Sequence, residues 1–234
     1  MRNIDVCPTP ELLHLYNLQN TVVVVVDILR ATSCMTTALA YGVEKIIPVA
    51  TLEECRAWQR KGYLAAAERD AKKADGFDLD NSPFSYMSAN LEGKTIAMTT
   101  TNGTLAITKS REAVKVIIGS FLNLSAITNY LLEQQYDVLV LCAGWKGKVN
   151  LEDTLFAGAV VEALQYDFAI NQDTALIAKM LYKVGGKNMP AFLATSSHVG
   201  RLHKLGIHQD INFCLQTNKF NVIPVLRGNA LVVL

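Results

Sequence analysis

A run of five valines at residues 22–26 ends directly in Asp27, and Arg30 follows three positions later. Consecutive β-branched residues are typical of a strand buried on both faces, so both groups are expected at the carboxyl end of a core strand. Thr32 and Ser33 then predict a helix start, where unpaired backbone N–H groups favour a bound anion. There Asp27 can hold a metal ion and Arg30 can bind a phosphate or sulfonate with its planar fork. The alternative is that Asp27 only caps the helix while Arg30 forms a surface ion pair, and this segment alone leaves both interpretations open.

Three more polar segments each come directly after a predicted strand. They are Glu68-Arg69 after residues 64–67, TTNGT at residues 100–104 after residues 95–99, and the loop at residues 142–153 after residues 136–141. In open α/β sheets, ligands bind beyond the carboxyl ends of the strands. These segments are therefore predicted to converge with Asp27 on one pocket.

The acidic residues of these segments suit a magnesium ion. Asp27, Glu68 and one of Glu152 or Asp153 supply the hard oxygen ligands that magnesium takes, with water completing the shell. A structural role is also open to them, because Glu68 can pair with Arg69, and the acids at 152–153 can stabilise the positive end of the following helix.

The TTNGT segment predicts an anion cradle. Thr101, Asn102 and Gly103 can present a hydroxyl, an amide and a backbone N–H to anionic oxygens, and glycine tolerates a positive φ. An ordinary Asn-Gly turn between two elements explains the same residues, and for this segment alone it is the more frequent case.

Other phosphate chemistries do not match these residues. The glycines at 144 and 147 lack the spacing of a P-loop, and Leu29 stands where phosphatases of the haloacid dehalogenase type have their second aspartate. Cys142 is not followed by the basic loop of a phosphocysteine mechanism, so a buried structural thiol is expected.

The elements that must position these residues alternate between strand and helix, which predicts an α/β fold. Helices are expected at residues 32–41, from about residue 51, at 124–132 and at 152–164, and further strands at 45–49, 114–118, 222–226 and 231–233. Residues 70–93 form a long polar loop, which in a compact domain is more often functional than idle. No linker marks a boundary, so residues 1–234 are expected to form a single domain with a more helical lobe from about residue 165.

The composition points to a small-molecule partner. The 234 residues are 50% hydrophobic, with 22 basic and 21 acidic side chains, so no overall field attracts nucleic acid or an anionic membrane. No signal peptide or membrane span is recognisable, and a cytoplasmic protein is expected. The five cysteines are odd in number and contain no CxxC pair, which argues against a disulfide scaffold or a zinc ribbon.

Taken together, these motifs resemble the 2-phosphosulfolactate phosphatases of coenzyme M biosynthesis and their bacterial relatives. The resemblance rests on VVVVVDILRATS at 22–33, AER at 67–69, GFDLDNSP at 76–83, TTNGT at 100–104, CAG at 142–144 with ED at 152–153, SSHVGRLHKLGIHQDINFC at 196–214 and VIPVL at 222–226. It implies a three-layer α/β/α fold with a largely parallel or mixed sheet. It also implies a magnesium-dependent phosphomonoesterase that hydrolyses a small phosphorylated, sulfonated hydroxy acid.

The resemblance suggests a role for each site residue. The magnesium ligands would be Asp27, Glu68 and Asp153, and Arg30 would clamp the remaining phosphate oxygens. The phosphate cradle would be formed by Thr32, Ser33, Thr101, Asn102, Gly103 and Thr104, and Arg69 would be available for the substrate's second anion. His198 and Arg201 lie one turn apart on an expected helix and can reach a carboxylate, although a capping or surface role is the more frequent one for such a histidine.

The sequence departs from the family pattern where glycines are usual. Ala67, Asp70 and Ala71 surround the Glu-Arg pair, and Asp80 precedes Asn-Ser-Pro, where it can replace a metal ligand, repel substrate or face solvent. These departures leave two other functions open, a non-catalytic binder or sensor of small phosphorylated acids and another metal-assisted enzyme such as a lyase. Homo-oligomerisation is left open as well.

Overall fold

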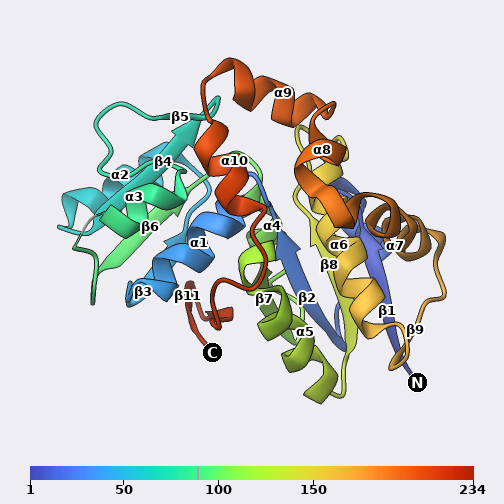
Figure 1. Ribbon diagram of the computed structural model, residues 1–234. Coiled ribbons are helices and arrows are strands. Elements are labelled where there is room, and N and C mark those ends of the chain that lie inside the picture. The colour runs from blue at the N-terminus through green and yellow to red at the C-terminus, as the bar shows by residue number, and fades with distance from the viewer. Residues whose placement is uncertain (89) are drawn as a thin grey trace.

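A single mixed β-sheet organises the chain, with helices on both of its faces (Figure 1). The computed structural model describes residues 1–88 and 90–234. The strands are β1 (Arg2–Cys7), β2 (Thr21–Val26), β3 (Lys45–Pro48), β4 (Leu64–Arg69), β5 (Lys72–Lys73), β6 (Thr95–Thr99), β7 (Lys115–Gly119), β8 (Asp137–Cys142), β9 (Phe168–Ala169), β10 (Pro224–Arg227) and β11 (Ala230–Val233). The α-helices are α1 (Ala31–Ala40), α2 (Leu52–Arg60), α3 (Pro83–Ser88), α4 (Gly103–Lys109), α5 (Leu124–Glu133), α6 (Leu151–Leu164), α7 (Asp173–Gly185), α8 (Met189–Leu193), α9 (Ser197–Lys204) and α10 (His208–Cys214). Short 3₁₀ turns span Pro10–Leu15, Phe121–Asn123 and Gly186–Asn188.

The valine run forms β2 in the middle of the sheet, as predicted. This strand pairs in parallel with β7 and β8, and its five valines are fully buried. Alternate valines face opposite sides: Val24 belongs to the core that contains Phe156 of α6, and Val25 belongs to the core that contains Met35 of α1. Burial on both faces explains why this strand is uniformly β-branched rather than alternating with polar residues.

The sheet is mixed because the C-terminal hairpin is inserted into it. The strand order is β5-β4-β6-β3-β11-β10-β7-β2-β8-β1-β9. Strand β10 is antiparallel to β7, β11 is antiparallel to β10, and β3 is antiparallel to β11. Strands β3, β6 and β4, which are parallel to one another, therefore run opposite to β2.

Strand twist brings the carboxyl end of β4 back toward that of β2. Neighbouring strands are rotated by about 20–25°, and this twist accumulates to roughly 120–150° over the six steps from β2 to β4. Although β4 is antiparallel to β2 by its pairing, this accumulated rotation leaves the two strands closer to parallel than to antiparallel. The predicted convergence of strand ends occurs, but by twist and not by the uniformly parallel order that the rule assumes.

Three local predictions were wrong. Strand β1 was not expected, although Ile4 and Val6 alternate with partly exposed residues in it. The turn predicted at residues 100–104 is shorter than expected, because α4 already starts at Gly103. The predicted 70–93 loop contains β5 and α3, and its residue 89 lies outside the described residues. Asp80 accounts for the start of α3, because its carboxylate accepts hydrogen bonds from the Ser82 backbone N–H (2.9 Å) and the Ser85 hydroxyl (2.7 Å).

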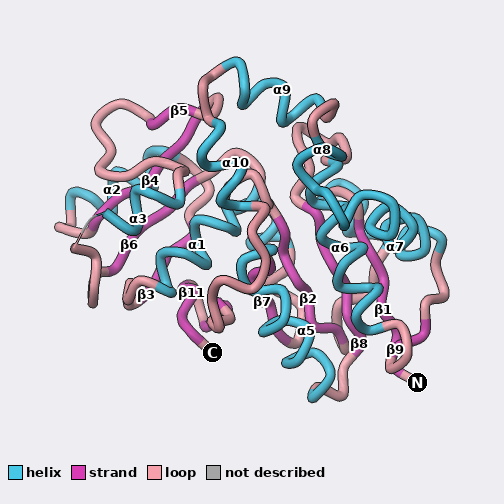
Figure 2. The backbone as a smooth tube through the Cα atoms, in the orientation of Figure 1, coloured by secondary structure: helices cyan, strands magenta, loops and turns pink. Residues whose placement is uncertain are grey.

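The chain after residue 165 is mostly helical, as predicted, and it closes over the strand ends. Helix α7 packs closely on α6, where a Cβ at Gly158 would lie 1.9 Å from the Ala178 carbonyl oxygen. Helix α9 crosses above the strand ends and leads into α10 (Figures 1 and 2). Among the described residues, none of these helices has the length and apolar character needed to cross a membrane.

Candidate active site

A cavity of about 150 Å³ lies at the strand ends beneath α9. Its lining comes from the end of β2, the β4–β5 hairpin, the turn before α4, the loop before α6, and α9 itself. Of the predicted site residues, Asp27, Arg30, Glu68, Thr101 and Asn102 line this cavity. Segments that are far apart in the sequence thus meet here, as the convergence argument predicted.

Asp27 lies at the centre of this arrangement, directly after β2. Its carboxylate is buried and accepts a hydrogen bond from the Ala31 backbone N–H at the start of α1. Burial raises the pKa of Asp27 to about 6, His198 opposes this rise, and the nearby acids Glu68 and Glu152 add to it. A bound cation would reduce this repulsion and favour the ionised form of the Asp27 carboxylate.

The two-residue turn between β4 and β5 positions Glu68. Strand pairing of Glu68 with Lys73 and of Arg69 with Lys72 leaves Asp70 and Ala71 at the tip, with φ values of 53° and 65°. Two-residue hairpins of this type need a positive φ at both central positions, a conformation that glycine adopts at no steric cost. The Ala71 N–H donates to the Glu68 carboxylate at 2.5 Å and so fixes its orientation.

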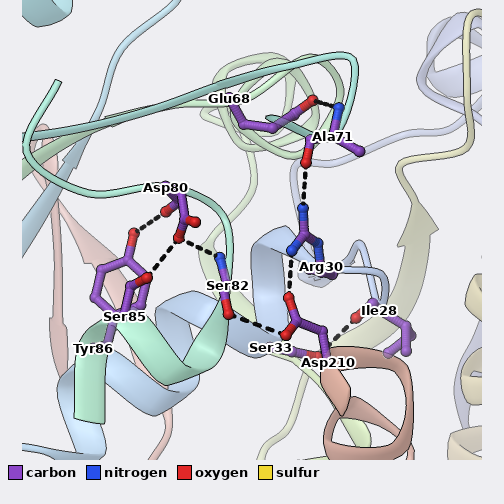
Figure 3. A network of polar contacts seen from close by, with 10 residues as sticks. All are labelled: Ile28, Arg30, Ser33, Glu68, Ala71, Asp80, Ser82, Ser85, Tyr86 and Asp210. Atoms are coloured by element: carbon purple, nitrogen blue, oxygen red, sulfur yellow. Dashed lines mark hydrogen bonds and ion pairs between the residues drawn. The ribbon is translucent and has the colours of Figure 1, made fainter. Parts of the chain in front are cut away.

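Arg30 connects this hairpin to α10. One guanidinium nitrogen pairs with the Asp210 carboxylate, and another donates to the Ala71 carbonyl oxygen at 3.0 Å (Figure 3). Asp210 also accepts from the Ser82 hydroxyl at 3.1 Å. Arg30 is only 5% exposed, so the alternative of a surface ion pair is wrong. Its predicted contact with phosphate remains a prediction, since Arg30 lines the cavity while two of its nitrogens hold protein groups.

The two acids at the start of α6 have different partners. Glu152 is completely buried, and its Oε1 lies 2.5 Å from Nδ1 of His198, so His198 does reach a carboxylate. Asp153 accepts main-chain N–H groups on both oxygens, from Ile28 at 2.9 Å and Gly144 at 3.1 Å, and it does not line the cavity. Burial and the neighbouring carboxylates hold the pKa of Asp153 well above its usual range. Within residues 1–88 and 90–234, no group of three His, Cys, Asp or Glu side chains has a metal-binding arrangement, so the predicted set of Asp27, Glu68 and Asp153 is not assembled here.

Several predicted substrate-binding residues shape the site instead of lining it. The hydroxyls of Thr32, Ser33 and Thr104 donate to the main-chain carbonyls of Asp27, Ile28 and Thr100 at 2.8 to 3.0 Å, and all three residues are buried. They stabilise the helix starts, as Ser and Thr side chains often do. Their predicted contact with the anion does not fit this placement.

Gly103 and Arg69 also lie outside the lining. A Cβ at Gly103 would be 2.8 Å from the Ala31 Cβ and 3.0 Å from Asp27 Oδ2, so glycine allows α4 to approach the central acid. Arg69 donates to the Glu68 carbonyl oxygen at 2.6 Å and is not part of the cavity lining.

The prediction missed part of the lining. Trp145 and Lys146 come from the loop before α6, Asn81 from the turn before α3, and Leu202 and Leu205 from the end of α9. The sequence signal for the first two is the GWKG turn, whose Trp145 and Lys148 main chains are hydrogen-bonded at 2.8 and 3.0 Å. That turn was tested only as a P-loop, for which its glycine spacing is wrong.

These observations define the class of the protein: a three-layer α/β protein with acids and amides gathered in one small cavity at the strand ends. The family model described as 2-phosphosulpholactate phosphatase matches residues 7–229, and the chain belongs to that family. The resemblance noted in the sequence is thereby confirmed.

Relatives with the same description match along most of their length. A "Probable 2-phosphosulfolactate phosphatase" of Caldanaerobacter subterraneus subsp. tengcongensis is 41% identical over 218 residues, covering 91% of this chain and 90% of the relative. A protein of that description from Thermotoga petrophila is 42% identical over 203 residues, covering 87% and 88%. One from Clostridium beijerinckii is 36% identical over 214 residues, covering 88% and 89%.

Proposed function

We propose that this chain is a magnesium-dependent phosphatase that hydrolyses 2-phosphosulfolactate, or a closely similar phosphorylated hydroxy acid, to the alcohol and phosphate. The observation that carries the proposal is the meeting of Asp27 and Glu68 with Thr101 and Asn102 in one cavity. Family membership and the names of the relatives support the same reaction.

The residues present fit a magnesium ion. Magnesium is usually held by one or two carboxylates together with water and substrate phosphate, and Asp27 and Glu68 provide two carboxylates on one side of the cavity. Asn81, which also lines the cavity, has an Oδ1 atom that is buried without a hydrogen-bond partner in the described part of the chain. When bound, the ion would neutralise charge on the phosphate during transfer.

The chain's own groups bind and orient the ester. Thr101 and Asn102 precede α4 and can donate to phosphate oxygens at the helix start. His198 is oriented through Nδ1 by the buried Glu152, which leaves Nε2 as the nitrogen that can give a proton to the leaving alkoxide oxygen. In this step water supplies the new oxygen on phosphorus, the ester P–O bond breaks, and the alcohol leaves with the proton from His198. One proton of the attacking water stays on the released phosphate and the other returns to His198.

Phosphate release measured with and without magnesium tests this function. We expect the purified protein to release phosphate from 2-phosphosulfolactate only with magnesium. Asp27→Asn should lower the rate about a hundredfold or more, since a charged ligand of the magnesium ion at the reacting phosphate is lost. The control is Asp75→Asn, which removes an exposed carboxylate of the β5–α3 segment.

Three results would contradict the proposal. Equal turnover by the Asp27 variant removes this residue from the reaction. Saturable binding without release indicates a sensor of phosphorylated acids. Loss of substrate without stoichiometric hydrolysis to sulfolactate indicates a lyase.

A further inference from the structure

Apart from Arg30, whose charge Asp210 neutralises, the acids and the cations of the cavity come from different elements. The acidic side consists of Asp27, Glu68 and Asp70, which belong to the ends of β2 and β4. The basic side consists of Lys146 and Arg201, from the loop before α6 and from α9. Magnesium and the phosphate it binds belong on the acidic side, so the proposed reaction leaves the basic side without a role.

The basic side is held together by Trp145. The Arg201 guanidinium carbon lies 4.0 Å from the centre of the Trp145 ring, and the Lys146 ammonium lies 4.6 Å from it. Lys146 has a φ of 50° and is followed by Gly147 with a φ of 76°, so a tight turn places the lysine next to the ring. An aromatic face attracts both cations and keeps two like charges close together.

Neither cation has an acidic partner in the part of the chain that the structure describes. Across residues 1–88 and 90–234 no carboxylate forms an ion pair with Lys146 or Arg201, and Nη2 of Arg201 is buried without a hydrogen bond. Arg30 in the same cavity differs, because Asp210 neutralises it. A buried guanidinium N–H without a partner is costly, which a bound anion would relieve.

We propose that Arg201 and Lys146, supported by Trp145, form a subsite for a second anionic group of the substrate, a carboxylate or a sulfonate. The planar fork of Arg201 suits either group, since both present two or three oxygens at hydrogen-bonding distance from one another. The subsite rests on the proposed phosphatase function. It assigns substrate selection to Arg201 of α9, which the sequence indicated only as able to reach a carboxylate, in place of Arg69 of the hairpin.

The test compares substrates that differ in the second anion. The ratio of kcat/KM for 2-phosphosulfolactate to kcat/KM for phenyl phosphate is measured in the wild type, Arg201→Gln and Arg201→Lys. We expect the ratio to fall about 10- to 100-fold in Arg201→Gln, the loss of a charge-assisted hydrogen bond, and less in Arg201→Lys. Lys204→Gln, an exposed cation on the same helix, is the control and should change the ratio less than twofold.

A binding measurement keeps the two proposals distinguishable. Sulfolactate, which has both acids but no phosphate, is titrated calorimetrically into each variant, and thermal melting checks that each is folded. We expect its Kd to rise at least tenfold in Arg201→Gln. An unchanged substrate ratio or an unchanged sulfolactate Kd overturns the subsite. If the wild type hydrolyses neither ester but sulfolactate binding still depends on Arg201, the phosphatase function fails and the subsite stands.

Discussion

Replacing Asp27 by asparagine should stabilise the metal-free protein. Its pKa is raised from 3.8 to about 6, chiefly by burial, so ionising it in the folded state costs about 3 kcal/mol at 1.36 kcal/mol per unit. As pH rises from about 3.8 to 6, the unfolded chain loses this proton before the folded chain does, so the free energy of unfolding falls over that window. Asparagine is nearly the same size, can still accept from the Ala31 N–H and does not ionise. The variant should therefore gain about 1 kcal/mol over wild type at pH 4.5 and about 3 kcal/mol at pH 7.5.

Urea unfolding at both pH values, without divalent cations, measures this difference. Asp75→Asn serves as the control for removing an exposed carboxylate and should show no pH-dependent gain. Adding magnesium should then reverse the order, because a ligand that binds only the folded wild type stabilises it and not the variant. A stability difference that is the same at both pH values, or an Asp27 variant less stable than wild type at pH 7.5, would refute the electrostatic reasoning.

Three further substitutions test the framework around the site. Arg30→Lys should lower kcat/KM at least tenfold, because a point charge cannot hold both Asp210 and the Ala71 carbonyl; equal kcat/KM would show that these contacts are dispensable. Ala71→Gly should raise the free energy of unfolding by about 1 kcal/mol in urea, since its φ of 65° strains any residue with a Cβ, and a lower stability would contradict this. Gly158→Ala should lower it by about 3 kcal/mol through overlap with α7, whereas the same change on an exposed helix face would raise it by about 1 kcal/mol.

Local signals were sufficient for much of the fold. The valine run predicted β2, and the helix expected from about residue 51 is α2. At its start the Thr51 hydroxyl accepts from the Glu54 N–H at 3.1 Å and the Glu54 carboxylate accepts from the Ala50 N–H at 2.9 Å. Strands 222–226 and 231–233 were also predicted as elements. Their position in the sheet was not predicted, because β10 pairs with β7, more than a hundred residues away. The hydrophobic pattern of neither segment indicates such a pairing.

The site residues that were predicted from the sequence are those that lie at strand ends. Asp27, Glu68 and Asn102 each come within three residues of a strand end, and all three line the cavity. Arg201 was predicted, with His198, to be able to reach a carboxylate, but its helix meets the cavity only through the packing of the C-terminal lobe, so no local rule could place it there. Thr32 shows the opposite error, because a hydroxyl at a helix start serves the backbone as readily as a ligand, and only the geometry distinguishes the two.

The antiparallel insertion of β10 and β11 explains why the site needs both ends of the chain. Through this hairpin β3 is held antiparallel to β2, and the twist over the intervening strands turns the end of β4 toward Asp27. The segment just before the hairpin contributes α10, whose Asp210 holds Arg30 and through it the Ala71 turn beside Glu68. The C-terminal third therefore sets the distance between the two acids in two ways, through the direction of the strands and through the buried ion pair. The proposed magnesium site has only two carboxylates and depends on that distance, so the acidic side of the cavity is complete only when the last strands are in the sheet.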